Sequence, residues 1–219
     1  MRIFNRNPKG RNCLVKVFVT DIASLADPSE NLALIDRLPT YRKEKILSLK
    51  KEADRKQSLG AGLLLRYALN KHGFSDADVF VGDNGKPICP GVGFNLSHSF
   101  DKILCAVGQG DLGCDVEKIR HAPRRRIRRF FSLPELEYLS CTSEWDRTFF
   151  QLWTAKESYL KMTGEGLRKA PTSFSVLAKD VSLPCIFQKF EDDGYIFSVC
   201  AMEEIENRLI YVSDDELFT

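Results

Sequence analysis

The sequence has no hydrophobic segment long enough to cross a membrane, because a spanning helix needs about 18 or more consecutive apolar residues. Residues 1–13 are polar and basic and lack the apolar core of a secretory signal, so we expect a cytoplasmic protein without membrane contacts. The chain also lacks a large charge of one sign. Its formal net charge of +2 argues against general nucleic-acid binding.

Cysteines in paired spacing are missing as well. There are seven cysteines, an odd number, and no two of them form a C-x-x-C pair. This pattern argues against a disulfide framework and against a zinc site of the usual spacing. Because most of the cysteines lie in apolar stretches, we interpret them as small buried side chains in a reducing environment.

The chain has 219 residues, of which 43% are hydrophobic, and this is enough to bury a substantial core. In the first part, alternating and helical patterns predict a strand, two helices and three strands over residues 13–22, 40–49, 51–72, 93–99, 103–107 and 113–119, the last two paired through a turn. In the second part, they predict two short helices, a long helix and three strands over residues 124–131, 134–141, 145–163, 174–177, 185–190 and 195–202. Because both parts follow a similar order, we predict an α+β protein of two similar lobes, residues 1–108 and 109–219, with a ligand cleft between them.

Two acidic residues share one face of the strand predicted over residues 113–119 (GCDVEKI). Side chains alternate along a strand, so Asp115 and Glu117 point one way while Cys114 points the other. Two adjacent carboxylates repel each other unless a cation relieves them, and Mg²⁺ uses one or two carboxylates together with phosphate oxygens. The alternative is an ordinary strand edge that faces solvent.

The long helix of the second part adds Glu157 and Lys161, four residues apart and therefore on one helical face. One interpretation is a surface ion pair worth about 0.3–0.5 kcal/mol. The other is a third carboxylate for the cation, with an ammonium group beside it to meet phosphate charge. The aromatic residues around Trp153 are interpreted as core.

Basic and hydroxyl groups in the first part are candidates for binding a phosphate group. His98 lies between Ser97 and Ser99 in residues 94–99 (FNLSHS), and all three side chains can donate hydrogen bonds. A lone histidine is otherwise usually structural. Lys86 lies on a predicted turn and is followed by Pro87, whose ring fixes its φ angle. The helices of the first part carry further cations, which otherwise simply face solvent: Arg42, Lys45, Arg55 and Lys56.

These motifs occur in an order that resembles the two-lobed 4′-phosphopantetheinyl transferases. The resemblance rests on residues 85–87 (GKP), 94–99 (FNLSHS), 113–119 (GCDVEKI), 129–132 (RFFS) and 153–167 (WTAKESYLKMTGEGL), and spans roughly residues 40–200. It implies two α+β lobes related by pseudo-twofold symmetry, with coenzyme A between them. It also implies transfer of 4′-phosphopantetheine from coenzyme A to a serine of an apo acyl or peptidyl carrier protein, with release of 3′,5′-ADP.

The resemblance implies a role for each matching residue. Glu157, Lys161 and Asp115 would be catalytic, and Asp115, Glu117 and Glu157 would bind Mg²⁺. The carrier serine would lose its proton to Glu157, or to a metal-bound water or hydroxide that Glu157 helps to orient. The pyrophosphate of coenzyme A would be contacted by His98 and Lys161, and its nucleotide by Lys86, Pro87 and Ser97. Its 3′-phosphate would be bound by Arg42, Lys45 and Lys56. Arg55 is the alternative to Lys56 after a shift of one residue.

A basic block precedes the long helix and comprises Arg120, Arg124, Arg125, Arg126, Arg128 and Arg129. We hypothesise that it faces the carrier protein, since the carriers of this family are acidic. The alternative is a solvated helix face. One chain supplies both walls of the cleft, which favours a monomer. Two other functions are a Mg²⁺-dependent phosphotransferase that acts on another nucleotide and a non-catalytic module that binds carrier proteins.

Overall fold

Two β-sheets form the centre of the computed structural model, which describes residues 14–30, 32–82, 85–125, 127–177 and 183–219. The first sheet has the order β4-β5-β1-β9 and contains β1 (Lys16–Asp21), β4 (Gly93–Ser99), β5 (Lys102–Gly108) and β9 (Ile210–Tyr211). The second has the order β6-β8-β7 and contains β6 (Leu112–Lys118), β7 (Ile186–Asp192) and β8 (Tyr195–Ala201). All neighbouring strands are antiparallel except β1 and β9.

Alternating side chains place the two sheets face to face. On β1, Val17 and Val19 belong to a buried cluster that also includes Cys114 and Val116 of β6, whereas Phe18 belongs to a cluster with residues of the helices. β1 and β6 therefore each bury one face between the sheets and the other against helices, as a period of two requires. The predicted opposite orientation of Cys114 and the acidic residues follows from this packing.

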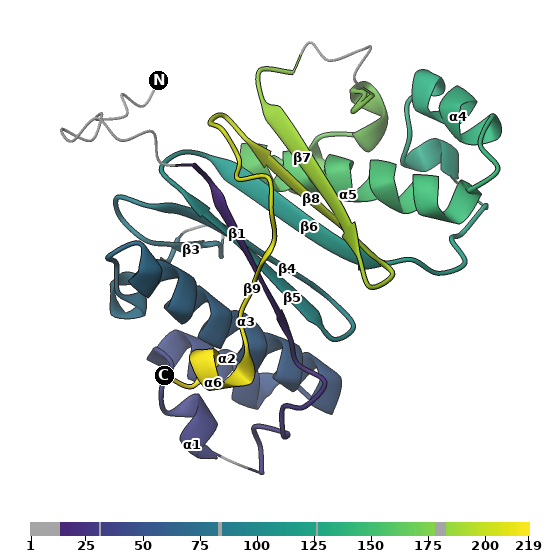
Figure 1. Cartoon of the computed structure of the whole chain (residues 1–219). Helices are drawn as coiled ribbons and strands as arrows, with labels where there is room; N and C mark the ends of the chain where they lie inside the picture. Colours follow the sequence, from purple (N-terminus) through teal and green to yellow (C-terminus); the bar gives the residue numbers. More distant parts are fainter. Residues whose placement is uncertain (1–13, 31, 83–84, 126, 178–182) are drawn as a thin grey trace.

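Helices cover the outer face of each sheet (Figure 1). We call the first sheet with α2 (Thr40–Ser48) and α3 (Glu52–Lys71) the first lobe. The second sheet with α4 (Leu133–Ser140) and α5 (Trp145–Thr163) is the second lobe. The shorter elements are α1 (Leu32–Ile35), η1 (Asp76–Asp78), β2 (Phe80–Val81), β3 (Pro87–Ile88), η2 (Ile127–Arg129), η3 (Gly166–Arg168), η4 (Pro171–Ser173) and α6 (Asp214–Leu217). None of the helices in the described ranges is long and apolar enough to span a membrane.

The α+β class is confirmed, and so are both long helices. Three local predictions are wrong. Residues 103–107 and 113–119 do not pair, because β5 lies between β4 and β1 while β6 pairs with β8. Among the described residues of the range 124–131, only the three-residue 3-10 helix η2 forms, because arginines at helical spacing would repel one another. Residues 174–177 form no strand, although Phe174 and Val176 are buried and give the segment its apolar pattern.

The end of the chain returns to the first lobe. β9 pairs in parallel with β1, and Val15 forms a bridge with Ile205. α6 then packs against α3. The predicted division assigned all of residues 109–219 to the second lobe, but residues 205–219 extend the first one (Figure 1). We keep the two-lobe division as a proposal with this change, and the pseudo-twofold relation stays a prediction.

Candidate active site between the two lobes

The edge strands β4 and β6 meet where the lobes join, and side chains rather than a backbone ladder connect them. Asn95, Ser97 and Ser99 share one face of β4. The Asn95 Oδ1 atom accepts a hydrogen bond from Cys114 N at 3.1 Å, and Ser99 Oγ accepts one from Lys118 N at 3.2 Å. Ser97 Oγ accepts a hydrogen bond from Val116 N at 3.4 Å. These contacts satisfy N–H groups at the edge of β6.

On its other face, β6 packs against α5, and Gly113 makes the close approach possible. A Cβ atom added to Gly113 would lie 2.0 Å from Ser158 O and 2.5 Å from Met162 N, both in the backbone of α5. Alternation from Gly113 turns Asp115 and Glu117 towards the same helix. The strand acids and the helix residues of the predicted site therefore meet.

Asp115 is buried, with 6% of its surface exposed, and its two carboxylate oxygens have different surroundings. Oδ1 accepts hydrogen bonds from Lys161 Nζ and from Ser97 Oγ, both at 2.7 Å. Oδ2 is buried and has no hydrogen-bond partner among the described residues. Lys161 of α5 thus pairs with Asp115 of β6, within the second lobe. It does not form the surface ion pair with Glu157 that helical spacing alone suggested.

The other two acids lie close enough to influence this pair. Glu117 Oε2 accepts hydrogen bonds from Ser99 Oγ and from the Arg120 guanidinium, both at 2.9 Å. Burial raises the pKa of Glu157, and the negative charges of Asp115 and Glu117 raise it further, while Lys161 opposes them. Glu157 is therefore a stronger base than an ordinary carboxylate.

The Asp115–Lys161 pair also has perturbed ionisation. Burial raises the pKa of Asp115, although Lys161 and the Ser97 hydroxyl work in the opposite direction. Burial alone would lower the pKa of Lys161, but the neighbouring Asp115 carboxylate outweighs it and the pKa is raised. Lys161 therefore stays positively charged at neutral pH, in the region where a diphosphate would need compensation.

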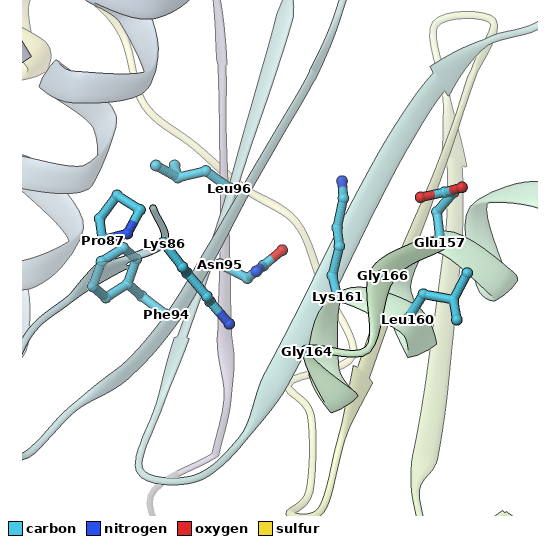
Figure 2. A pocket seen from close by; sticks show the side chains of 10 residues that line it. All are labelled: Lys86, Pro87, Phe94, Asn95, Leu96, Glu157, Leu160, Lys161, Gly164 and Gly166. Atoms are coloured by element: carbon cyan, nitrogen blue, oxygen red, sulfur yellow. The ribbon is translucent and has the colours of Figure 1, made fainter. Parts of the chain in front are cut away.

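A pocket of about 370 Å³ opens beside these groups. Its lining includes Lys86 and Pro87 from the first lobe and Glu157 and Lys161 from α5, as Figure 2 shows. Asn95 extends into the space between the two walls. The remaining lining residues are Phe94, Leu96, Leu160, Gly164 and Gly166. The predicted nucleotide-site residues Lys86 and Pro87 thus lie opposite the predicted catalytic helix.

The proposed phosphate cradle of Ser97, His98 and Ser99 does not form as a unit. Alternation places both serine hydroxyls towards β6 and the exposed His98 on the opposite face. Each serine donates its single hydroxyl proton to a carboxylate, so neither has one left for a phosphate. Partial desolvation of the ring lowers the pKa of His98, and Lys161 and Lys45 lower it further, so the imidazole is neutral at pH 7.

The predicted 3′-phosphate ligands lie on α2 and α3 outside the lining of the pocket. Arg42 is buried against Gly62, and its Nε has no partner among the described residues. Lys45 is exposed, but partial desolvation of its amine and the positive charge of Arg42 lower its pKa. Lys56 forms an ion pair with Glu52 at 2.7 Å.

Arg55, the alternative to Lys56, has a structural role. Its guanidinium group pairs with Asp27 and donates to the carbonyl oxygens of Leu49 and Lys50. These bonds fasten the turn between α2 and α3 to the segment that follows β1. Arg55 is therefore committed elsewhere and is not a ligand candidate.

The residues present fit a hard cation, although the described part of the chain contains no group of three histidine, cysteine or acidic residues that could enclose one. The unpartnered Oδ2 of Asp115 is a buried carboxylate oxygen that needs a positive partner. Glu157 and Glu117 contribute negative charge to the same region. Mg²⁺ does not require a complete protein cage, because phosphate oxygens and water complete its shell.

Sequence reasoning missed Asn95, which both lines the pocket and binds β6. It also missed the role of Ser99 and Arg120, which it assigns to phosphate and carrier binding although they hold Glu117. The available signal was the period of two in residues 94–99, which puts three polar side chains on one strand face. No local pattern indicates that β6 lies opposite that face.

Comparison with known proteins is consistent with this geometry. A family profile described as "4′-phosphopantetheinyl transferase superfamily" matches residues 111–208. The chain is 31% identical over 211 residues to the 4′-phosphopantetheinyl transferase Sfp of Bacillus subtilis strain 168, across 86% of this chain and 93% of that protein. It is 34% identical over 179 residues to another 4′-phosphopantetheinyl transferase of Bacillus subtilis, across 73% of this chain and 80% of that protein. The chain therefore belongs to the 4′-phosphopantetheinyl transferase superfamily.

Proposed function

We propose that this protein transfers 4′-phosphopantetheine from coenzyme A to a serine hydroxyl of an apo acyl or peptidyl carrier protein, with Mg²⁺ as its cofactor. The observation that carries the proposal is the convergence of Asp115, Glu157 and Lys161 beside a pocket with one wall from each lobe. Membership of the family supplies the reaction. We also propose that the protein is a monomer, since one chain builds both pocket walls. We propose the cytoplasm as its location.

In this reaction the carrier serine oxygen forms a bond to the phosphorus that carries pantetheine. The bond from that phosphorus to 3′,5′-ADP breaks, and 3′,5′-ADP leaves with the electron pair. The serine proton passes to Glu157, which is a stronger base than an ordinary carboxylate because burial and the charge of Asp115 raise its pKa. The protein forms no covalent intermediate.

Charge compensation is the second requirement of phosphoryl transfer. The Lys161 ammonium donates its three N–H groups to Ser97 Oγ, Cys114 O and Asp115 Oδ1, which fix its position. It therefore offers the diphosphate a fixed positive charge. Asp115, Glu117 and Glu157 would hold Mg²⁺, which would neutralise the charge that develops on the leaving group.

Coenzyme A would lie along the pocket towards the first lobe. Lys86 and Pro87 would contact its nucleotide, and His98 would meet the pyrophosphate as a neutral hydrogen-bond partner. Arg42, Lys45 and Lys56 remain the candidates for the 3′-phosphate. Lys45 suits the role best, because it is exposed and close enough to His98 to lower its pKa.

The proposal predicts transfer of a fluorescent pantetheine arm from labelled coenzyme A to an apo-carrier. Labelling should require the target serine, should stop with EDTA and should return with Mg²⁺. Several carriers from fatty-acid, polyketide and peptide synthases should be compared by in-gel fluorescence and intact mass. Failure to label every carrier, together with Mg²⁺-dependent turnover of another nucleotide, would favour a different phosphotransferase. Carrier binding without transfer would favour a non-catalytic module.

The carrier should dock against the basic block. Its described arginines at positions 124, 125, 128 and 129 are exposed, while Arg126 lies outside the described residues. Arg120 is partly engaged by Glu117. An acidic carrier would be attracted to such a surface.

Reversing Arg125 and Arg128 to glutamate should raise the KM for the carrier and leave the Kd for coenzyme A unchanged. Because the effect is electrostatic, the difference from the unaltered protein should shrink at high salt. Steady-state labelling at two ionic strengths measures both quantities. Equal KM values at low salt would show that the carrier docks elsewhere.

A further inference from the structure

The acids of β6 are held in the same way. Each has one carboxylate oxygen that accepts two hydrogen bonds, one from a β4 serine and one from a cationic side chain. For Asp115 the donors are Ser97 and Lys161, and both bonds end on Oδ1. For Glu117 the donors are Ser99 and Arg120, and both bonds end on Oε2. The second oxygen of each acid is thereby left for another partner.

Ser99 uses its whole hydroxyl group in this arrangement. It is buried, with 7% of its surface exposed. Its one proton goes to Glu117 Oε2 at 2.9 Å, and its oxygen accepts the Lys118 backbone N–H at 3.2 Å. The hydroxyl therefore ties the side chain of Glu117 to the backbone of the next residue on the same strand. A hydroxyl with this geometry selects one orientation of the carboxylate.

The strand end that carries Ser99 is itself fixed. The next residue, Phe100, has a φ of 52°, a left-handed conformation that is uncommon for a residue with a side chain. Its carbonyl oxygen accepts a hydrogen bond from Gln57 Nε2 of α3 at 2.9 Å. Ser99 is thus presented by a turn anchored to the first lobe, whereas Glu117 belongs to the second.

We infer that Ser99 is a positioning residue that orients Glu117 towards the cation, so that the first lobe sets the geometry of a metal ligand carried by the second. This inference rests on the proposed function, which supplies the cation. Without the hydroxyl, Glu117 would keep only the bond from Arg120, whose side chain is 46% exposed and correspondingly less constrained. Outer partners of metal ligands typically contribute about 10–100-fold to metal affinity.

The test measures Mn²⁺ binding in the presence of coenzyme A by the electron paramagnetic resonance signal of free Mn²⁺, with no carrier present. Ser99→Ala should raise the Kd for Mn²⁺ by about 10-fold or more. Ser99→Thr, which keeps the hydroxyl, should restore the affinity. The Kd for coenzyme A, measured without metal, should not change, which separates positioning of Glu117 from a general disturbance of the pocket.

Ser198→Ala is the matched control. Ser198 lies opposite Asp115 in the same sheet and is fully buried, but its hydroxyl faces that of Ser158 rather than an acid. Its loss should leave Mn²⁺ affinity unchanged. Because Ser99→Ala leaves the Lys118 N–H without its acceptor, Ser99→Cys provides a second variant of nearly the same shape with only a weak donor, and it should also bind Mn²⁺ more weakly.

The outcomes separate this inference from the function on which it rests. Normal Mn²⁺ affinity in Ser99→Ala or Ser99→Cys overturns the role of Ser99 while carrier labelling by the unaltered protein still stands. An equal loss in Ser198→Ala also overturns it, because the effect would then be a general one of buried hydroxyls. Absence of any Mn²⁺ binding by the unaltered protein removes the cation itself and contradicts both.

Discussion

Replacing Glu157 or Asp115 by alanine is expected to reduce labelling of the apo-carrier by at least about 100-fold, the scale of losing one key electrostatic group. Glu157→Ala removes the base with the raised pKa and one cation ligand. Asp115→Ala removes the unpartnered Oδ2 and also leaves Lys161 without its carboxylate. Both losses fall on the chemical step, so kcat should decrease while the Kd for coenzyme A changes much less.

Single-turnover labelling at saturating coenzyme A measures the effect on the chemical step directly. Glu137→Ala is a matched control, because Glu137 is an exposed acid of α4 in the same lobe. This variant should label the carrier at the normal rate. Circular dichroism should show that all three variants fold. Near-normal labelling by folded Glu157→Ala or Asp115→Ala would contradict the assignment of the site.

The second large effect is expected on stability. Lys156 and Glu135 form an ion pair at 2.8 Å in which both side chains have no exposed surface. Lys156 also donates to the carbonyl oxygens of Pro171 and Phe174, and Glu135 accepts the Val176 N–H. Removing one member leaves the other as an uncompensated buried charge. Lys156→Met should therefore lower the free energy of unfolding by about 3–5 kcal/mol.

Chemical denaturation followed by tryptophan fluorescence tests this, since both tryptophans lie in the second lobe on α5. Arg147→Gln is the control: it removes two surface ion pairs of the same helix, with Glu144 and Glu191, and should leave the denaturation midpoint nearly unchanged. Glu135→Leu combined with Lys156→Met should stay destabilised, because the backbone groups of residues 171–176 lose their partners. A midpoint for Lys156→Met equal to that of Arg147→Gln would disprove the prediction.

Much of the fold follows from local pattern. The predicted helix over residues 145–163 matches α5 because its apolar positions recur at helical spacing. The predicted strand over residues 174–177 is wrong for an instructive reason. Its apolar side chains are buried, but the Val176 N–H finds its acceptor in Glu135 rather than in a neighbouring strand. Such an acceptor lies far away in the sequence, and no window of residues reveals it.

The site divides in the same way. The alternation of β6 and the spacing of α5 placed Asp115, Glu117, Glu157 and Lys161 on the correct faces of their own elements. The contacts between elements could not be predicted. Lys161 pairs with Asp115 because α5 packs closely on β6. That close packing is possible because glycine at position 113 has no side chain.

The return of the chain end to the first lobe has a consequence for synthesis on the ribosome. β9 contributes the fourth strand of the first sheet, and α6 covers α3. A nascent chain that has released only residues 1–108 therefore lacks this strand, so native pairing along that edge must wait until β9 has left the ribosome. Contacts so distant in sequence slow folding, because a long loop has to close first. Until then, the growing chain exposes one side of β1 to chaperones or to other nascent chains.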